Sequence, residues 1–494
     1  MLAPVGDCFY NFIDNQFTEP SGSEHFRRSN PARHEEVITE GRFASTKDIR
    51  LAEVSARNAI PRWRMRPAKS RAEIVARAID SLEAQTEHLA YWVTRENGKP
   101  IHEARAECAR AIDSARQNIG FFLEHSGATS RQLGGVHGIL LYEPLGTALL
   151  ITPWNYPVAT ILRKLIPALL CGNSVILKPS ELTPVSAQII CSAFLAAELE
   201  PGVLSLLAGG SAVGRSLIEN RNFEALSFTG STTVGLAIAQ ATGGSQIRTQ
   251  LEMGGKNPLV VHEDANLEQA VEALVVGGLT CSGQWCVGTS RVLVHKNVYQ
   301  RFLDLSLASF AKVQVGDGFD SSTTMGPLIS EQQFDKVSRF LTRAAADGSE
   351  LQAGGPDVAD SQQGWFVGPT LIANTPLDSP LWNEEVFGPV LAMRSYDTLD
   401  EAIALSNDSK YGLTASVFTE SHFVASKFIS GVDYGRVSVN TSTGVTHALL
   451  PHGGRRESGR GEPENGLHGL RFFSQHKSAY VANLNIDSVL GGIN

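Results

Sequence analysis

Residues 146–178 read GTALLITPWNYPVATILRKLIPALLCGNSVILK, and this stretch decides the fold class. An apolar run, GTALLI, precedes a helical pattern, and NSVILK forms a second apolar run after it. Short buried runs on either side of a helix are typical of a strand–helix–strand unit with parallel strands. The alternation continues through GVLSLLAGG at 202–210 and ALSFTGS at 225–231. The sequence therefore predicts an α/β fold with a doubly wound parallel sheet.

Helical patterns precede this sheet. Residues 70–98 repeat apolar positions at helical spacing and predict one amphipathic helix, with a Ser70/Glu73 capping box at its start and Gly98 at its end. A second helix is expected over 101–125, after a proline. Both helices look like scaffold rather than parts of a site.

A strand and a second α/β region are expected further on. Residues 136–142 are rich in β-forming residues and predict a strand that leaves the surface of the first domain. The second α/β region begins near Gly254 and runs past Asn440, interrupted by turn-rich stretches. Two or three domains are therefore expected in a chain of 494 residues.

Charge and composition exclude several classes of partner. The net charge is −9 with both signs interspersed, which argues against a nucleic-acid or anionic-membrane surface. No apolar run is long enough to cross a bilayer, and no signal peptide is visible. The six cysteines form no CxxC pair, which suits reduced thiols. We therefore expect a cytoplasmic globular protein.

Three stretches offer reactive side chains, and each has an ordinary structural alternative. In TCSGQWCVGTSR, glycines let the backbone bring Cys286 to a pocket wall, although an isolated cysteine is usually a small core residue. In TPWNYP, two prolines fix the backbone around Asn155, whose amide can be an oxyanion donor or simply close a turn. In LEMGGKNP, Glu252 is either a general base with a pKa raised by desolvation or a solvated surface residue.

Other turns could hold a dinucleotide. The sequence FTGSTTVG places Gly230 at a strand–helix turn where amides can face an anion, although a lone glycine pair is usually only a tight turn. The stretch KPSE at 178–181 ends a strand with groups that can hold ribose hydroxyls. Its ordinary alternative is a polar loop. Because Glu181 would repel a 2′-phosphate, NAD is favoured, with NADP possible. EEVFGP at 384–389 offers a carboxylate and a ring for a second ribose and a flat heterocycle.

The order of TPWNYP, KPSE, FTGST, LEMGGKNP, GQWC and EEVFGPV resembles the aldehyde dehydrogenase superfamily over nearly the whole chain. The resemblance implies that Cys286 is the nucleophile, that Asn155 is the oxyanion donor with the Cys286 amide, and that Glu252 is the base. No metal is required. The resemblance also implies the following cofactor contacts: Thr152, Trp154, Lys178, Ser180, Glu181, Gly210, Gly230, Ser231, Glu385 and Phe387.

The resemblance further implies a domain division and an oligomer. Residues 1–124 and 145–254 would form the dinucleotide-binding domain, and 255–457 the catalytic domain. Residues 125–144 and 458–494 would form an oligomerisation arm and tail that pair between subunits of a homodimer or homotetramer.

One segment departs from the family pattern. PHGGRRESG at 451–459 has His452 where the family has Phe, and Arg456 where Lys is common. Because the alignment slips by one residue after it, either Glu462 or Glu464 could be the second proton-relay carboxylate.

The substrate is a small aldehyde, and Arg163 is the main clue to its class. Arg163 falls where relatives that act on semialdehyde acids place an arginine, and its fork could bind a carboxylate in a bidentate manner. A surface arginine on an amphipathic helix is the ordinary alternative. The stretches GTSR at 288–291 and VNTSTGV at 439–445 are similar to those of 2-oxoglutarate semialdehyde dehydrogenases.

We therefore expect oxidation of an ω-semialdehyde acid of the succinate or 2-oxoglutarate semialdehyde type through a cysteine thiohemiacetal and thioester. Nonpolar aliphatic or aromatic aldehydes are the alternative substrates. A non-catalytic structural or binding relative is an alternative of another class, and so is a cofactor-independent cysteine hydrolase, which would need a histidine partner.

Overall fold

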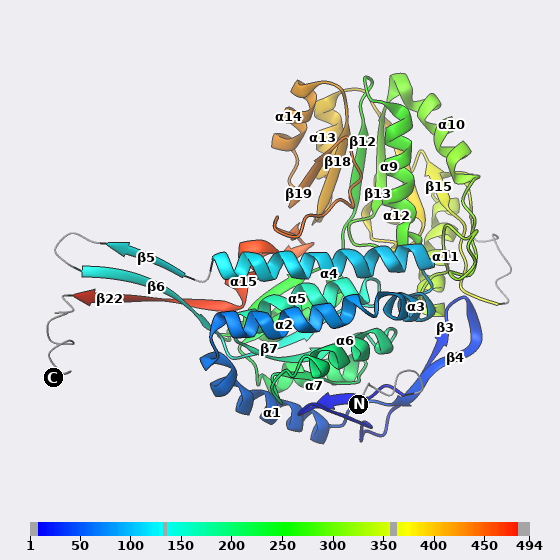
Figure 1. Ribbon diagram of the computed structural model, residues 1–494. Helices are drawn as coiled ribbons and strands as arrows, with labels where there is room; N and C mark the ends of the chain where they lie inside the picture. The colour runs from blue at the N-terminus through cyan, green and yellow to red at the C-terminus, as the bar shows by residue number, and fades with distance from the viewer. Residues whose placement is uncertain (1–7, 126, 132–135, 356–362, 483–494) are drawn as a thin grey trace, which may run out of the picture.

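The computed structural model describes residues 8–125, 127–131, 136–355 and 363–482. Two large sheets with helices on their faces form the body, and a three-stranded arm projects from it (Figure 1). In the described part of the chain, no helix is long and apolar enough to span a bilayer. The cytoplasmic location stays a prediction.

The first sheet has the strand order β2-β1-β9-β8-β7-β10-β11-β21. Its five central strands are parallel, which confirms the doubly wound sheet. These strands are almost wholly buried, as expected for continuous apolar runs covered on both faces. The strands are β1 (Asn11–Ile13), β2 (Gln16–Thr18), β7 (Thr147–Ile151), β8 (Ser174–Lys178), β9 (Leu204–Leu206), β10 (Ala225–Thr229), β11 (Arg248–Glu252) and β21 (Gly459–Arg460).

Helices cover both faces of this sheet and connect its strands. The connecting helices are α5 (Pro157–Leu170), α6 (Pro184–Ala196), α7 (Ser211–Asn220) and α8 (Thr232–Thr242). The strand order reverses between β7 and β10, because β8 and β9 lie on one side of β7 and β10 and β11 lie on the other. Such a switch point leaves a crevice outside the carboxyl ends of the strands, where ligands bind.

The second sheet has the order β14-β15-β16-β13-β12-β18-β19, and it lies at the top of Figure 1. Its strands are β12 (Asn257–Val261), β13 (Thr289–His295), β14 (Glu350–Ala353), β15 (Thr370–Ala373), β16 (Val390–Tyr396), β18 (Thr414–Phe418) and β19 (Arg436–Val439). The helices of this half are α9 (Leu267–Leu279), α10 (Tyr299–Phe310), α11 (Glu331–Ala346), α12 (Pro380–Asn383), α13 (Leu399–Asn407) and α14 (His422–Gly431).

The prediction of one helix over residues 70–98 is wrong. The chain forms α2 (Ala68–Glu83) and α3 (Thr86–Asn97) instead, with a break at residues 84–85. Both helices pack their apolar faces into one core, so the periodicity of the sequence passes through the break unchanged. The predicted capping box is also wrong, because α2 begins at Ala68, its N-cap residue is Pro67, and no side chain caps the helix. The predicted end is confirmed by Gly98, which has a φ of 90°.

The other predicted helix is confirmed as α4 (Ile101–Glu124). It runs along the boundary between the two halves of the body (Figure 1). The remaining N-terminal elements are the hairpin β3 (His25–Asn30) and β4 (Arg33–Arg42) and the helix α1 (Thr46–Met65).

The arm consists of β5 (Gly127–Arg131), β6 (Val136–Pro144) and β22 (Ser474–Ala482), in the order β22-β6-β5. The predicted arm and the predicted tail strand therefore pair with each other within one chain, from Ser474 opposite Pro144 onward. The sequence interpretation had placed this pairing between subunits.

The C-terminal segment contacts both halves before it reaches the arm. β20 (Arg455–Arg456) pairs with β17 (Tyr411–Gly412), and β21 then joins the first sheet beside β11. A short helix, α15 (Gly466–Phe472), precedes β22. The domain boundaries drawn from the sequence stay predictions.

Candidate active site

A cavity of about 370 Å³ lies where the two halves meet. Its wall combines α4, α5, the ends of β10 and β11, and segments from the second half of the chain. All four predicted catalytic and substrate residues line it, namely Asn155, Arg163, Glu252 and Cys286. The fold thus brings together side chains that are up to 131 positions apart in the sequence, as Asn155 and Cys286 are.

Cys286 follows a short turn, η1 (Thr280–Gly283), in which Cys281 and Ser282 have φ values of 54° and 55°. The Cys286 carbonyl accepts a hydrogen bond of 2.8 Å from the Asn257 side chain, which fixes the peptide. Burial raises the pKa of the Cys286 thiol to about 12, although Arg163 opposes the shift. The resting side chain is therefore a thiol that needs a proton acceptor before it can attack.

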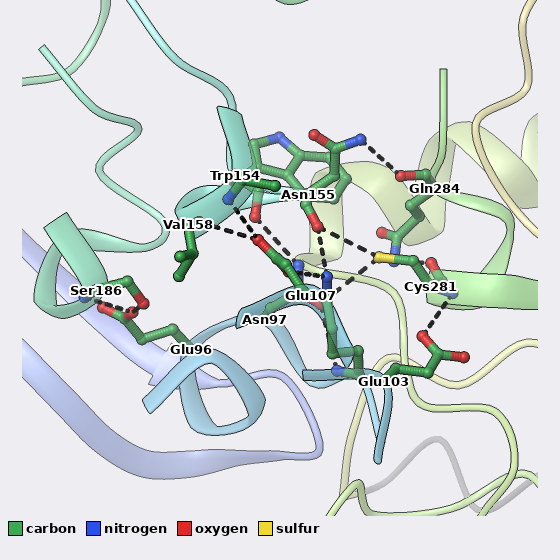
Figure 2. Close-up of polar contacts among 12 residues, drawn as sticks. Glu96, Asn97, Glu103, Glu107, Trp154, Asn155, Val158, Ser186, Cys281 and Gln284 are labelled. Atoms are coloured by element: carbon green, nitrogen blue, oxygen red, sulfur yellow. Dashed lines mark hydrogen bonds and ion pairs between the residues drawn. The ribbon is translucent and has the colours of Figure 1, made fainter. Parts of the chain in front are cut away.

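Asn155 lies in the loop between β7 and α5, and its side chain is buried. Its amide nitrogen donates to the Gln284 carbonyl at 2.9 Å, two residues before Cys286 (Figure 2). The amide carries a second N–H, which remains for another acceptor. This contact holds the predicted oxyanion donor against the segment that carries the predicted nucleophile.

Glu252 ends β11 and is buried, with no hydrogen-bond partner for its Oε2 among the described residues. Burial raises its pKa well above the ordinary value, and the nearby Glu464 adds to the shift, while Lys164 and Arg163 oppose it. A carboxyl group with a raised pKa can accept a proton at neutral or alkaline pH. Glu252 can therefore act as a base in this cavity.

The structure separates Glu462 from Glu464. Glu464 is buried at the cavity wall, and its carboxylate contacts Lys164 Nζ and, at 3.3 Å, Arg163 Nη1. Burial works against ionisation of Glu464, but Lys164 and Arg163 lower its pKa below the ordinary value. Glu462 is half exposed and pairs with His468 at 2.8 Å. Only Glu464 is placed where it can exchange protons with the cavity.

Two residues near the cavity, Lys164 and Arg436, were missed by sequence reasoning. Lys164 is fully buried and donates to Ser227 Oγ at 2.8 Å as well as to Glu464. Arg436 donates to His452 Nδ1 at 3.2 Å and also to the Val445 carbonyl. The departure of His452 from the family pattern was the only available signal, since Lys164 resembles any helix-surface lysine in sequence.

The charges of these residues leave the cavity wall with excess positive charge. Burial lowers the pKa of Arg436 to about 10, so it remains a cation at neutral pH. Burial also lowers the pKa of His452 well below the ordinary value, helped by Arg163 and Arg436, so this ring is neutral. Around the cavity, the cations Arg110, Arg163, Lys164 and Arg436 therefore outnumber the carboxylates Glu464 and Glu107, of which Glu107 is paired with Lys99. Cys286 and Glu252 are in their protonated forms.

The predicted cofactor residues of the first half gather at the carboxyl ends of its strands. Lys178 ends β8, and its Nζ lies 3.8 Å from Glu181. Gly210 precedes α7, and Ser231 caps α8 by accepting from the Val234 amide. Thr152 Oγ1 is buried without a hydrogen-bond partner in the described structure. A carboxylate, an orphan hydroxyl and two helix N-termini fit the ribose and phosphate groups of a dinucleotide.

The cofactor residues of the second half meet those of the first. The rings of Trp154 and Phe387 are edge to face, with centroids 5.4 Å apart. Glu385 accepts from the Gly255 amide at 3.0 Å, and a Cβ at Gly254 would lie 2.4 Å from its Oε2. Gly254 is therefore required for this close approach. Eight of the ten predicted cofactor residues thus lie at or after the carboxyl ends of β7, β8, β9 and β10, and Glu385 and Phe387 of the second half contact Gly255 and Trp154.

No metal-binding group was found in the part of the chain that the structure describes. There, no three His, Cys, Asp or Glu side chains come together in a way that could hold an ion.

Comparison with known proteins shows the family of the chain. The family model described as "Aldehyde dehydrogenase family" matches residues 17–479. An alpha-ketoglutaric semialdehyde dehydrogenase from Bacillus subtilis is 34% identical, over 96% of this chain and 98% of that protein. A D-glyceraldehyde dehydrogenase (NADP(+)) from Picrophilus torridus is 32% identical, over 97% of this chain and 98% of that protein.

The fold has close relatives among solved structures. The structure of an NAD-dependent aldehyde dehydrogenase from Sinorhizobium meliloti superimposes with a TM-score of 0.93 at 31% identity, over 96% of this chain and 95% of that one. Sequence motifs, cavity geometry and fold therefore agree, and the chain belongs to the aldehyde dehydrogenase family of NAD(P)-dependent oxidoreductases.

Proposed function

We propose that this enzyme oxidises an ω-semialdehyde acid of the succinate or 2-oxoglutarate semialdehyde type, with NAD as its preferred cofactor. The observation that carries the proposal is the excess of cations around the cavity, where Arg163 and Arg110 at the wall and Lys164 and Arg436 close to it outnumber Glu464 and Glu107, and Glu107 is already paired with Lys99. An acidic substrate would supply the missing negative charge. The Bacillus subtilis relative, whose name states such a substrate, supports the same class.

Arg163 is the proposed carboxylate ligand. Its side chain is 25% exposed and lines the same cavity as Cys286, so it is not a plain helix-surface arginine. One Nη contacts Glu464 at 3.3 Å, a long contact that leaves the other N–H groups of the fork for a second carboxylate. The substrate would then be held at its acid end while its aldehyde carbon meets the Cys286 sulfur.

Uncharged aldehydes are the alternative substrates. Arg163 already has Glu464 as a partner, and the cavity wall includes apolar side chains such as Trp285 and Leu413. The name of the Picrophilus torridus relative states an uncharged substrate. This alternative leaves the oxidation chemistry unchanged and alters only the role of Arg163.

The proposed acylation uses Cys286 and Asn155. The Cys286 thiol gives its proton to the ionised form of Glu252, and the sulfur adds to the aldehyde carbon to form a thiohemiacetal. The Asn155 side chain and the Cys286 backbone N–H hold the negative charge that develops on the aldehyde oxygen. The bound nicotinamide supplies the hydride acceptor, since no side chain can take a hydride. Loss of the hydride leaves a thioester on Cys286.

The proposed hydrolysis uses Glu252 and Glu464. Glu252 takes a proton from a water molecule as its oxygen attacks the thioester carbon, and the Cys286 sulfur leaves to give the free acid. Glu464, paired with Lys164, is the second carboxylate through which the proton can move away from Glu252. A base that activates water favours hydrolysis over transfer of the acyl group to a thiol cofactor.

The cofactor preference follows from Glu181. Its carboxylate lies beside Lys178 and close to Gly210, where an added Cβ would be 3.6 Å from Glu181 Oε1. A carboxylate there can accept from a free 2′-hydroxyl and repels a 2′-phosphate. Lys178 softens that repulsion, which is consistent with NADP as a secondary cofactor.

We also infer a homodimer or homotetramer in which the arm takes part. In the arm sheet, β22 and β5 each pair only with β6, so each has one free strand edge in the described structure. Free edges are ready to pair with another chain.

Cys286→Ser should lower NADH formation by about 1,000-fold or more, because a serine hydroxyl without an activating base is a much weaker nucleophile. Cys281→Ser is the matched control and should retain activity within a few-fold, because Cys281 does not line the cavity and a serine hydroxyl can keep its contact with the Asn155 carbonyl. Absorbance at 340 nm measures both. Loss of activity in Cys281→Ser, with retention in Cys286→Ser, would reassign the nucleophile.

Glu464→Gln should move the acidic limb of the kcat profile to lower pH by about one unit or more. The raised pKa of Glu252 keeps this base protonated below that pKa, and Glu464 is part of the cause. Removing the negative charge leaves Lys164 and Arg163 unopposed, so the pKa of Glu252 falls. Initial rates from pH 5 to about 10 measure the shift. Glu462→Gln should leave the limb in place, and an unmoved limb in Glu464→Gln contradicts the coupling.

Arg163→Ala should raise KM for succinate and 2-oxoglutarate semialdehydes by about 10- to 100-fold, the effect of losing a hydrogen-bonded charge pair. KM for butanal and benzaldehyde should stay within about threefold. Arg110→Ala removes another arginine of the cavity wall and separates a specific ligand from a general charge effect. Equal KM changes for acids and uncharged aldehydes would return Arg163 to a structural role.

Glu181→Gln should raise kcat/KM for NADP by about fivefold or more, because one repulsive charge beside the 2′-phosphate is removed. The wild-type enzyme should prefer NAD, and the value for NAD should change little. Steady-state rates with each cofactor at saturating aldehyde test this. A wild-type preference for NADP would contradict the assignment of Glu181.

A further inference from the structure

A buried ion pair lies just behind the loop that carries Asn155. Lys99 Nζ and Glu107 Oε2 are 2.7 Å apart, and their side chains are 1% and 0% exposed. Burying two charges costs desolvation free energy, and the attraction between the two charges often does not offset that cost. Stability alone therefore does not explain this pair. The other contacts of Lys99 and Glu107 indicate what the pair does.

Besides the Cys281 thiol, Lys99 has two further partners, and both are in the oxyanion loop. Lys99 Nζ donates to the Asn155 carbonyl at 2.7 Å, and it lies 4.0 Å from the centroid of the Tyr156 ring. The Asn155 side chain meanwhile donates to the Gln284 carbonyl. Asn155 is thus held at both ends, by Lys99 through its backbone and by the cysteine segment through its amide.

The second carboxylate oxygen of Glu107 holds the other end of the same loop. Glu107 Oε1 accepts from the Val158 amide at 2.9 Å and from the Ala159 amide at 3.1 Å. These amides belong to the first turn of α5, where no side chain of the helix itself provides a cap. Glu107 therefore caps α5 from a neighbouring helix, and the favourable interaction with the helix N-terminus supports its charge.

The same stretch of chain also holds the segment that leads to Cys286. Asn97 donates to the Trp154 carbonyl at 3.2 Å, and Glu103 accepts from the Cys281 amide at 2.9 Å (Figure 2). The start of α4 and the residues before it thus contact both the oxyanion loop and the turn before the cysteine. One rigid element sets how far apart the two loops lie.

We propose that the Lys99–Glu107 pair is a positioning device that fixes the Asn155 amide for the charge that develops on the substrate oxygen. Asn155 lines the cavity with Cys286, and the pair holds the loop of Asn155 through backbone groups, namely the Asn155 carbonyl and the Val158 amide. Hydrogen-bond donors stabilise an oxyanion only within a few tenths of an ångström of the right place, and a misplacement of about 1 Å can cost about 100-fold in rate. The inference rests on the proposed role of Asn155 as the oxyanion donor.

The test compares two reactions of Cys286 that differ in one respect. Acylation by 4-nitrophenyl acetate passes through a tetrahedral oxyanion and needs no hydride acceptor, whereas alkylation by iodoacetamide displaces iodide and builds no such charge. Lys99→Met should slow acylation by about 10- to 100-fold. It should leave the alkylation rate within about twofold. A merely structural role would lower both rates together.

Lys99→Met alone leaves the buried Glu107 carboxylate without its partner, and this could prevent folding. The Lys99→Met/Glu107→Gln double variant avoids that problem. It removes both charges while retaining the side-chain volumes, so no buried charge is left alone. The same fall in acylation without a fall in alkylation is expected.

Glu96→Gln is the matched control. Glu96 is a fully buried carboxylate that caps α6 in the same way, accepting from Ser186 N at 3.1 Å and from Ser186 Oγ at 2.7 Å (Figure 2). Its side chain bonds to neither loop of the cavity in the described structure. Glu96→Gln should therefore lower the melting temperature but leave ester acylation unchanged.

The outcomes separate this inference from the proposed function. If Asn155→Ala slows acylation while Lys99→Met and the double variant acylate at the wild-type rate, the positioning role is overturned and the role of Asn155 stands. Wild-type acylation by Asn155→Ala would overturn both. Parallel loss of acylation and alkylation in the double variant, or an equal acylation defect in Glu96→Gln, would reduce the pair to a general support of the fold.

Discussion

The contact between Glu464 and Lys164 closes the cavity, and much of the rest of the structure depends on it. The two residues are 300 positions apart, one beyond the last strand of the second sheet and the other inside α5 of the first half. Both side chains are almost completely buried. Removal of one charge would therefore leave the other unpaired in the interior, which costs free energy of folding. Their pairing fixes the C-terminal segment over the carboxyl ends of the parallel strands. It also places a negative charge beside Glu252, which adds to the rise in pKa that burial causes at the proposed base.

The reacting groups of the cavity start in their neutral forms. Burial raises the pKa values of both Cys286 and Glu252, and the surrounding arginines only partly oppose it. The same cations keep Glu464 ionised and leave the wall with excess positive charge. A substrate that brings its own carboxylate would balance that charge. The chemistry of the site and the proposed substrate class therefore share one electrostatic cause.

Loops of the two halves contact each other both at the predicted cofactor residues and at the cavity. The edge-to-face contact of Trp154 with Phe387 and the hydrogen bond from Gly255 to Glu385 join the halves on the cofactor side. On the far side, the beginning of α4 reaches both the Asn155 loop and the turn before Cys286. Movement of one half against the other would thus change cofactor, oxyanion donor and nucleophile together, which explains why so many buried polar contacts concentrate at this boundary.

The sequence alone determined the parallel sheet, helix α4 and the end of α3 at Gly98, because these follow from local patterns of apolar residues and backbone freedom. Motif order also identified Cys286, Asn155 and Glu252, which the fold then places in one cavity. Periodicity could not reveal the break at residues 84–85, since the buried face continues across it. The choice of Glu464 over Glu462, the pairing of Arg163 and the neighbourhood of Arg436 and His452 were decided only by tertiary structure. Each of these features depends on which side chains from distant parts of the sequence are buried together. The local sequence does not show which residues those are.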